Sequence, residues 1–235
     1  MELKRLLSLT RQAIDDYKMI NEGDKIAVGI SGGKDSITLL YALSELRRFY
    51  PKSFELMAVT VDVGLSMDFS PIQKLCNELG VEYSIVKTSI KQIVFDEKKE
   101  QNPCSLCAKM RKGALNDELK RLGFNKVAYG HHKDDFISTM FLSLMYEGRF
   151  QSLDPSFTLD KTGVSVIRPL MYVSESEVIG FVNRYNLPIV KSTCPADGNT
   201  KRKYVEDMLA QMNRDNPGVK DRLFSAIKRE MSEQI

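Results

Sequence analysis

The stretch KIAVGISGGKDSITLLYAL, residues 25–43, decides the architecture of this chain. Its first six residues form a short apolar run bounded by turn residues, which is typical of a buried strand. A glycine-rich turn, SGGKDS (31–36), follows, and apolar positions then recur at helical spacing to about Phe49. A strand, a tight glycine turn and a helix bring backbone N–H groups and the positive end of the helix together, so we expect the turn to bind phosphate.

Strands and helices alternate along most of the chain. Further buried strands are predicted at 54–64, 82–88 and 125–132, and helices at about 71–79, at 134–146 and from a cysteine turn at 104–107 to Gly123. Continuous apolar strands that alternate with helices predict a parallel sheet covered by helices on both faces. We therefore expect an α/β fold, a Rossmann-like doubly wound parallel sheet.

Helical patterns flank this sheet at both ends of the chain. One spans residues 3–19, and three more lie near 174–185, 201–212 and 217–231, after a loop-like stretch with a small strand at 164–167. This order predicts an N-terminal helix in 1–22, a nucleotide-binding domain in 23–190 and a C-terminal helical segment in 191–235.

Composition is that of an ordinary globular protein, with 43% hydrophobic and 28% charged residues in a chain of 235. The net charge of +3 permits nucleic-acid binding without arguing for it. No apolar run approaches the roughly 18 residues of a membrane span, and the first residues carry acidic side chains where a secretory signal would be apolar. We expect a cytoplasmic protein with no membrane partner.

The residues of the glycine turn suit phosphate binding. Gly32 and Gly33 allow close backbone approach, Lys34 can neutralise phosphate oxygens, and Ser36 can contact phosphate and cap the helix. The alternative is an ordinary turn with a surface lysine. The string SGGKDS resembles the PP-loop of the ATP pyrophosphatase family, whose members cleave ATP between the α and β phosphates and leave AMP on a substrate oxygen. The resemblance implies that Lys34 and Asp35 act in catalysis and that the ATP contacts include Ser31, Gly32, Gly33, Lys34, Asp35 and Ser36.

Carboxylates follow two of the predicted strands, where magnesium would be needed to neutralise a departing pyrophosphate. Asp62 closes the second strand, and Asp134 and Asp135 end the string GHHKDD (130–135) at a helix start, where acids also serve as helix caps. GHHKDD resembles the second signature of the PP-loop family. The resemblance extends the ATP site to Asp62, Gly130, His131, Asp134 and Asp135, with magnesium on Asp35 and Asp135. His131 and His132, the only histidines, are expected to contact nucleotide or make structural hydrogen bonds, and neither is assigned as a base.

The four cysteines suggest metal binding rather than disulfides, because no export signal is present. Cys104 and Cys107 have a spacing that lets two thiolates reach one metal, and Cys194 is a candidate third ligand. Cys76 lies in phase with the apolar positions of a helix and is expected to be a buried structural thiol. Three ligands and one open position suit a 4Fe-4S cluster with one free iron.

Three longer stretches narrow the resemblance. The run from CSLC (104–107) through GHHKDD, the string VIRPLMYVSESEV (166–178) and the late cysteine before EDML resemble the tRNA 2-thiocytidine biosynthesis family, from Ser31 to about Lys228. That family pattern around the third cysteine reads Cys-Gly-Ser-Gln-x-Asn-Leu-x-Arg, whereas this chain has CPADGNTKR, which keeps Asn199 and Arg202 in place. The resemblance implies a 4Fe-4S cluster on Cys104, Cys107 and Cys194. It also implies adenylation of the C2 oxygen of a tRNA cytidine and its replacement by sulfur, with ATP and magnesium, a sulfur donor such as a cysteine desulfurase, and a homodimer.

Basic residues flank the proposed cluster ligands and are candidates for tRNA contacts, and the alternative is that they lie on solvated helix faces. They are Lys109, Arg111 and Lys112 after the cysteine pair and Lys201, Arg202 and Lys203 after Cys194. Two other functions stay open at this point. One is a PP-loop ligase or thiolase acting on another substrate, with zinc on the cysteines, and the other is a nucleotide- or tRNA-binding module without turnover.

Overall fold

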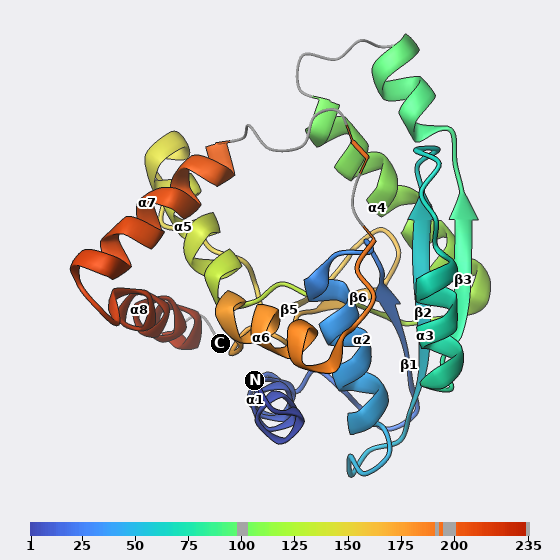
Figure 1. Ribbon diagram of the computed structural model, residues 1–235, viewed down its shortest axis with the longest axis horizontal. Coiled ribbons are helices and arrows are strands. Elements are labelled where there is room, and N and C mark those ends of the chain that lie inside the picture. Colours follow the sequence, from blue (N-terminus) through green and yellow to red (C-terminus); the bar gives the residue numbers. More distant parts are fainter. Residues whose placement is uncertain (98–102, 191–192, 195–200, 234–235) are drawn as a thin grey trace.

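The computed structural model describes residues 1–97, 103–190, 193–194 and 201–233. A central sheet lies among helices, and the two C-terminal helices lie to one side of it (Figure 1). The strands are β1 (Asp24–Gly29), β2 (Phe54–Asp62), β3 (Glu82–Lys87), β4 (Lys126–Ala128), β5 (Ser156–Thr158) and β6 (Ser165–Ile167). The helices are α1 (Leu3–Asp16), α2 (Lys34–Leu46), α3 (Ser70–Glu78), the π-helix η1 (Gln92–Glu97), α4 (Pro103–Leu122), α5 (Lys133–Glu147), α6 (Glu175–Tyr185), α7 (Lys201–Asp215) and α8 (Val219–Glu233).

The strand order β3-β2-β1-β4-β6-β5 confirms the predicted doubly wound sheet. All neighbouring strands pair in parallel except β5, which pairs antiparallel with β6. The chain moves outward from β1 in one direction through β2 and β3, and in the other through β4 and β6. This order places a topological switch point between β1 and β4, where ligands bind at the carboxyl ends of the strands.

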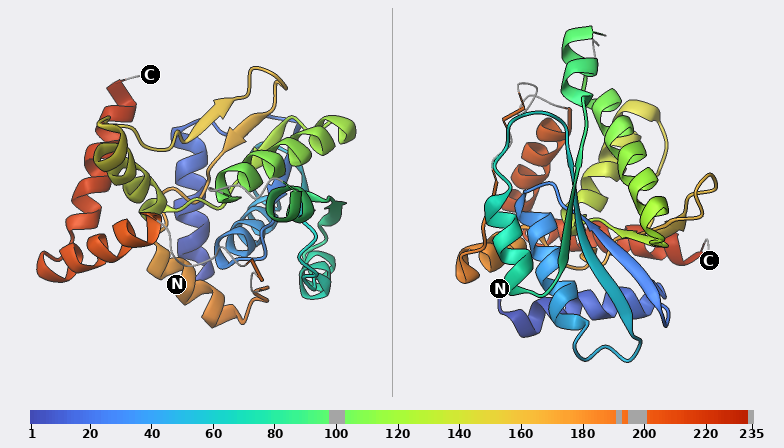
Figure 2. Two further views of the ribbon diagram at one scale, coloured as in Figure 1. Left: turned by 90° about the horizontal axis from the view of Figure 1, so that it is seen from above. Right: turned by 90° about the vertical axis from the view of Figure 1, so that its right-hand side faces the viewer.

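The apolar run of β1 is continuous because both faces of the sheet are covered. Ile26 and Val28 belong to the apolar cluster on the side of α1, α2 and α3, whereas Ala27 belongs to the cluster beneath α4. Figure 2 shows these helices on the two sides of the sheet. Successive side chains of a strand point to opposite faces, so a strand covered twice needs apolar residues at every position.

Two local predictions need correction, and one element was not predicted. The cysteine pair lies in the first turn of α4 and not in a turn before it, because Pro103 starts the helix and its fixed φ suits the first helical position. Strand β5 was expected as loop, and its three residues pair only with β6 across a short connection. The π-helix η1 carries no pattern that separates it from a loop.

The C-terminal helices share the main core. Val205 and Leu209 of α7 and Phe224 and Ile227 of α8 are buried in the same apolar cluster as α2. The domain boundary expected at residue 191 lies outside the described residues, as does Asn199, so that division stays a prediction. None of the helices in the described part of the chain combines the length and apolar character that a membrane crossing requires.

A buried ion pair joins the start of β1 to β4. Lys126 Nζ lies 2.9 Å from Asp24 Oδ2 and donates to the Met19 carbonyl at 2.7 Å, and both charged side chains are under 10% exposed. Asp24 also accepts hydrogen bonds from the Asn21 N–H and the Asn125 side chain. The pair therefore ties the end of the N-terminal segment to the two central strands.

Replacing Lys126 with Met should lower the free energy of unfolding by about 3–5 kcal/mol, because the Asp24 carboxylate stays buried without its cation. The exposed neighbouring pair of Lys25 and Glu55, at 3.0 Å, is the control. Lys25→Met should cost less than about 1 kcal/mol, since solvent screens that pair. Urea denaturation measures the free energy of unfolding of both variants. Equal losses in the two would contradict the stabilising role of the buried pair.

The same pair should make stability depend on pH. Burial alone would raise the pKa of Asp24, but hydrogen bonds from Asn21, Lys126 and Asn125 outweigh it and lower the pKa. An unfolded aspartate titrates near about 3.9, so this stabilisation is present above that pH and is lost as the pH falls through the lowered folded pKa. The free energy of unfolding, measured across this acidic range, should fall less steeply with pH in Lys126→Met than in the wild type.

Candidate active site

The glycine turn lies at the carboxyl end of β1 and is closed by Ser36. The Ser31 N–H donates to Ser36 Oγ at 3.2 Å, and that hydroxyl donates to the Gly33 carbonyl at 3.0 Å. Gly32 has a φ of +87°, in the left-handed region that favours glycine, and its carbonyl accepts the Val190 N–H at 3.0 Å. The turn is thus held both by its own serines and by the chain that leads to Cys194.

Gly130 lets the second predicted motif touch this turn backbone to backbone. A Cβ atom at Gly130 would lie 2.6 Å from the Asp35 carbonyl oxygen, 2.7 Å from its carbon and 2.9 Å from the Ser36 nitrogen. Such distances are closer than any real Cβ contact, so only glycine fits this position. The two strand ends on either side of the switch point therefore form one site.

A cavity of about 540 Å³ opens at this edge of the sheet. Its volume lies within the usual range for small-molecule sites. Its apolar walls include Ile30, Val59, Val61, Leu115 and Val166. Its polar lining includes Ser31, Asp35, Ser36, Gly130, His131, Asp135, Arg111, Lys112, Arg168 and Arg202, together with the aromatic rings of Tyr129 and Phe157. Of the predicted ATP residues, five are not part of this lining: Gly32, Gly33, Lys34, Asp62 and Asp134.

Asp35 places a buried oxygen without a hydrogen-bond partner at the cavity. Its Oδ1 atom lies 3.2 Å from Lys34 Nζ and 3.5 Å from His132 Nε2, but within the described residues no group hydrogen-bonds to it. Burial raises the pKa of Asp35, against the opposing charges of His132 and Lys34. Asp135 lines the same cavity and accepts the His132 N–H through Oδ2 at 2.9 Å. These two carboxylates fit a magnesium ion, which uses one or two carboxylates together with substrate phosphates.

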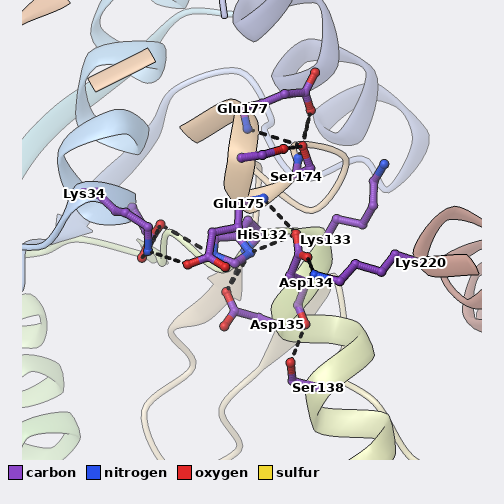
Figure 3. A network of polar contacts seen from close by, with 12 residues as sticks. Lys34, His132, Lys133, Asp134, Asp135, Ser138, Ser174, Glu175, Glu177 and Lys220 are labelled. Atoms are coloured by element: carbon purple, nitrogen blue, oxygen red, sulfur yellow. Dashed lines mark hydrogen bonds and ion pairs between the residues drawn. The ribbon is translucent and has the colours of Figure 1, made fainter. Parts of the chain in front are cut away.

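Asp134 is engaged on the opposite side of the start of α5 (Figure 3). Its Oδ1 accepts Lys220 Nζ at 2.7 Å, and its Oδ2 accepts the Glu175 N–H at 2.7 Å. Burial opposes ionisation of Asp134, but these partners outweigh it and lower its pKa. Asp134 therefore joins α5 to α6 and α8.

Lys34 lies between the PP-loop residue Asp35 and Glu175 of α6. Its Nζ lies 3.1 Å from Glu175 Oε1 and 3.2 Å from Asp35 Oδ1 (Figure 3). Burial would lower the pKa of Lys34, but the two carboxylates outweigh it and raise the pKa. Asp62, at the end of β2, accepts the Gly64 N–H through Oδ1 at 2.9 Å and stabilises the turn after the strand. The predicted ATP roles of Lys34, Asp62 and Asp134, like those of the residues that line the cavity, stay predictions.

His131 lines the cavity and accepts a hydrogen bond from Arg168. Arg168 Nε donates to His131 Nδ1 at 3.1 Å, so the proton of the neutral ring lies on Nε2. Burial, followed by the charge of Arg168, lowers the pKa of His131 to about 4. Arg168 also donates to the Asp154 carbonyl and lies 5.3 Å above the Phe157 ring. His131 is therefore neutral near pH 7, which argues against a cationic role.

Three basic or aromatic residues of the lining were not among the predicted site residues. Tyr129 directly precedes GHHKDD, and Arg168 lies within the quoted string VIRPL, so both were adjacent to recognised signals. Phe157 lies on the unpredicted strand β5 and carried no signal. Tyr129 reaches the cavity because Gly29 has no side chain: a Cβ there would lie 3.0 Å from the tyrosine ring.

The three candidate cluster cysteines lie within electrostatic range of one another. Cys104 is exposed and Cys107 half-buried in the first turn of α4, and Cys194 is half-buried in a loop whose Thr193 Oγ1 donates to the Leu65 carbonyl at 3.0 Å. Burial raises the pKa of Cys107, Arg111 opposes that rise, and Cys194 and Cys104 add to it.

Three neighbouring cysteines provide the thiolate ligands that an iron–sulfur cluster uses. Across the residues that the structure describes, no three His, Cys, Asp or Glu side chains form a group that could hold one metal ion. A four-iron cluster is larger than an ion, so its thiolate ligands stand farther apart, and thiolates are its usual ligands. Cys76 is fully buried, and burial raises its pKa to about 11, as expected for an inert structural thiol.

The six predicted tRNA residues have different surroundings. Lys109 is exposed on α4, whereas Arg111 and Lys112 line the cavity. Lys201 lies with Nζ 4.2 Å from the centre of the Tyr146 ring. Arg202 lines the cavity, and Lys203 is exposed and pairs with Asp207 at 2.8 Å. Their roles toward tRNA stay predictions.

Comparison with known proteins identifies the family. Residues 4–212 match the PP-loop domain. The chain is 36% identical over 228 residues to the tRNA-cytidine(32) 2-sulfurtransferase of Pelobacter propionicus, covering 95% of this chain and 85% of that protein. It is 37% identical over 227 residues to the protein of the same name from Citrifermentans bemidjiense, covering 95% and 89%. This chain belongs to the PP-loop family. The resemblance to its tRNA 2-thiocytidine branch is likewise confirmed.

Two solved structures agree with the fold. The U34-tRNA thiolase NcsA from Methanococcus maripaludis, solved with its [4Fe-4S] cluster, superposes with a TM-score of 0.79 at 27% identity, covering 97% of this chain and 78% of that chain. The NH3-dependent NAD synthetase from Campylobacter jejuni shares the fold alone, with a TM-score of 0.53 at 17% identity over 99% of this chain and 94% of that chain. The α/β Rossmann-like fold expected of a PP-loop protein is confirmed.

Replacing Gly130 with Ala should displace the PP-loop, because the new Cβ meets backbone atoms of Asp35 and Ser36 that have no flexible end to move. We expect the affinity for ATP to fall at least about tenfold and the melting temperature to decrease. Calorimetric titration with ATP and thermal unfolding measure the two effects.

Gly113→Ala is the matched control. Gly113 lies within α4, and a Cβ atom added there would have nothing within 4 Å, so alanine should stabilise the helix by about 0.5–1 kcal/mol. ATP binding should not change. Unaltered ATP affinity in Gly130→Ala would show that the close approach does not matter for the site.

Proposed function

We propose that this protein is an ATP-dependent tRNA sulfurtransferase that converts a tRNA cytidine to 2-thiocytidine, releasing AMP and pyrophosphate. The observation that carries the proposal is one cavity lined both by the PP-loop and by Arg111, which lies one helical turn after Cys107. The phosphate turn and the helix that carries Cys104 and Cys107 therefore border the same cavity. The names of the curated relatives and the thiolase title of the structural neighbour support this assignment.

In the first step the cytidine C2 oxygen bonds to the α-phosphorus of ATP while the bond from that phosphorus to the β-phosphate oxygen breaks. Pyrophosphate leaves with the electron pair. The turn N–H groups, the positive end of α2 and the Lys34 ammonium stabilise the leaving charge. Asp35 and Asp135 would hold magnesium, which supplies further neutralisation of phosphate charge.

In the second step a sulfide-level sulfur bonds to C2 while the C2–O bond breaks, and AMP leaves with that oxygen. Cys104, Cys107 and Cys194 would hold a 4Fe-4S cluster, which supplies an iron with an open coordination position for sulfur. Arg111 favours the thiolate form of Cys107 against burial. A sulfur donor such as a cysteine desulfurase, a homodimeric state and a cytoplasmic location stay predictions.

Analysis of tRNA nucleosides tests the reaction. Cells that lack this protein should lack 2-thiocytidine, and the purified protein with ATP, sulfide and their tRNA should restore it with release of pyrophosphate. Lys34→Ala should abolish pyrophosphate release but keep its metal content, because the turn and the cysteines belong to separate elements. Nucleotide binding without turnover would instead favour a binding module. If the cells lack a different thiolated nucleoside, the protein has a different thiolation substrate.

Metal analysis tests the cysteine assignment. Protein purified without oxygen should contain iron and acid-labile sulfide, and Cys104→Ala, Cys107→Ala and Cys194→Ala should each lose most of it. Cys76→Ala is the control and should keep the full content, because Cys76 is buried in the core away from the others. Stoichiometric zinc in place of iron, or full iron in Cys104→Ala, would contradict the cluster.

A further inference from the structure

We infer that Arg202 is a phosphate-binding residue of the ATP site, brought there by α7, and not part of a tRNA-binding surface. The inference deepens the proposed function and rests on it, since it assigns a further residue to the nucleotide half of that reaction. It also departs from the tRNA role that its sequence neighbours suggest.

Three consecutive basic residues separate in space. Lys201 packs over the Tyr146 ring at 4.2 Å, and Lys203 pairs with Asp207 at 2.8 Å on an exposed part of α7. Arg202 lies between them in sequence, yet its side chain lines the cavity. On a helix, successive side chains point about 100° apart, so one residue of the three can face the site while its neighbours do not.

Arg202 is anchored at the cavity by a carboxylate of the site. Its Nη1 lies 2.9 Å from Asp135 Oδ1, and Asp135 accepts the His132 N–H through its other oxygen. His132 in turn lies 3.5 Å from Oδ1 of Asp35, a PP-loop residue. Arg202 is thus connected to the phosphate turn through short polar contacts.

Basic side chains line this cavity, as the charge of a triphosphate requires, and they are Arg111, Lys112, Arg168 and Arg202. Asp35 and Asp135 already place two carboxylates beside the phosphate turn, and Lys34 is paired with Asp35 and Glu175. Arg168 already bonds to His131 and the Asp154 carbonyl. A triphosphate entering this cavity adds further negative charge, and a guanidinium has five N–H donors, enough to bond a carboxylate and phosphate oxygens together.

Substitution of Arg202, compared with its two neighbours, tests the inference. The variants are Arg202→Ala, Arg202→Lys, Lys201→Ala and Lys203→Ala. Binding of an ATP analogue that cannot be cleaved between the α and β phosphates, of adenosine and of tRNA is measured separately on the full chain. Arg202→Ala should weaken binding of the analogue by about tenfold or more and leave adenosine and tRNA binding within about twofold.

The conservative variant separates a charge effect from a folding defect. Arg202→Lys should recover part of the lost affinity for the analogue, because it keeps the charge but not the planar guanidinium. Lys201→Ala and Lys203→Ala should leave binding of the analogue unchanged. Equal weakening of adenosine and analogue, or weaker tRNA binding with unchanged binding of the analogue, would overturn the inference. Because these measurements use binding alone, they are independent of the proposed function. Failure of that function would appear as 2-thiocytidine that persists in cells lacking the protein or that the purified protein does not restore.

Discussion

The backbone contact between Gly130 and the start of α2 is the constraint on which the site depends. It brings the chain after β4 against the chain after β1, at the point where the strand order reverses. Any side chain at residue 130 would force these two segments apart. This close approach lets Asp35 of one segment and Asp135 of the other both contact His132, and it places two carboxylates in the cavity lining.

Charges at this edge of the sheet are largely paired within the protein. Lys34 bonds to two carboxylates, Arg202 to Asp135, and Lys220 to Asp134. A polyphosphate that binds here therefore replaces carboxylate partners of these basic side chains, because the charged groups are already paired within the protein. The Oδ1 atom of Asp35 is buried and lies 3.2 Å from Lys34 Nζ, so a magnesium ion on Asp35 would share this carboxylate with the lysine or replace it.

Long elements with a clear period were predictable, and short or irregular ones were not. The five parallel strands and the helices around them appear where the apolar pattern placed them, because a buried element needs apolar residues over its whole covered surface. Strand β5 has three residues, and its place follows from pairing with β6. The cysteine pair was expected in a turn, yet Pro103 lets the helix begin before Cys104.

The sequence by itself determined the fold class, the phosphate-binding turn and the set of candidate ligands, because these depend on local pattern and residue chemistry. Only the tertiary structure determines which of these candidate residues line the same cavity. Asp134 and Asp135 are adjacent, but one joins α6 and α8 while the other faces the cavity. Lys201, Arg202 and Lys203 divide in the same way. Adjacent side chains on a helix point in different directions, and what each one meets depends on elements distant in the chain, which no local pattern encodes.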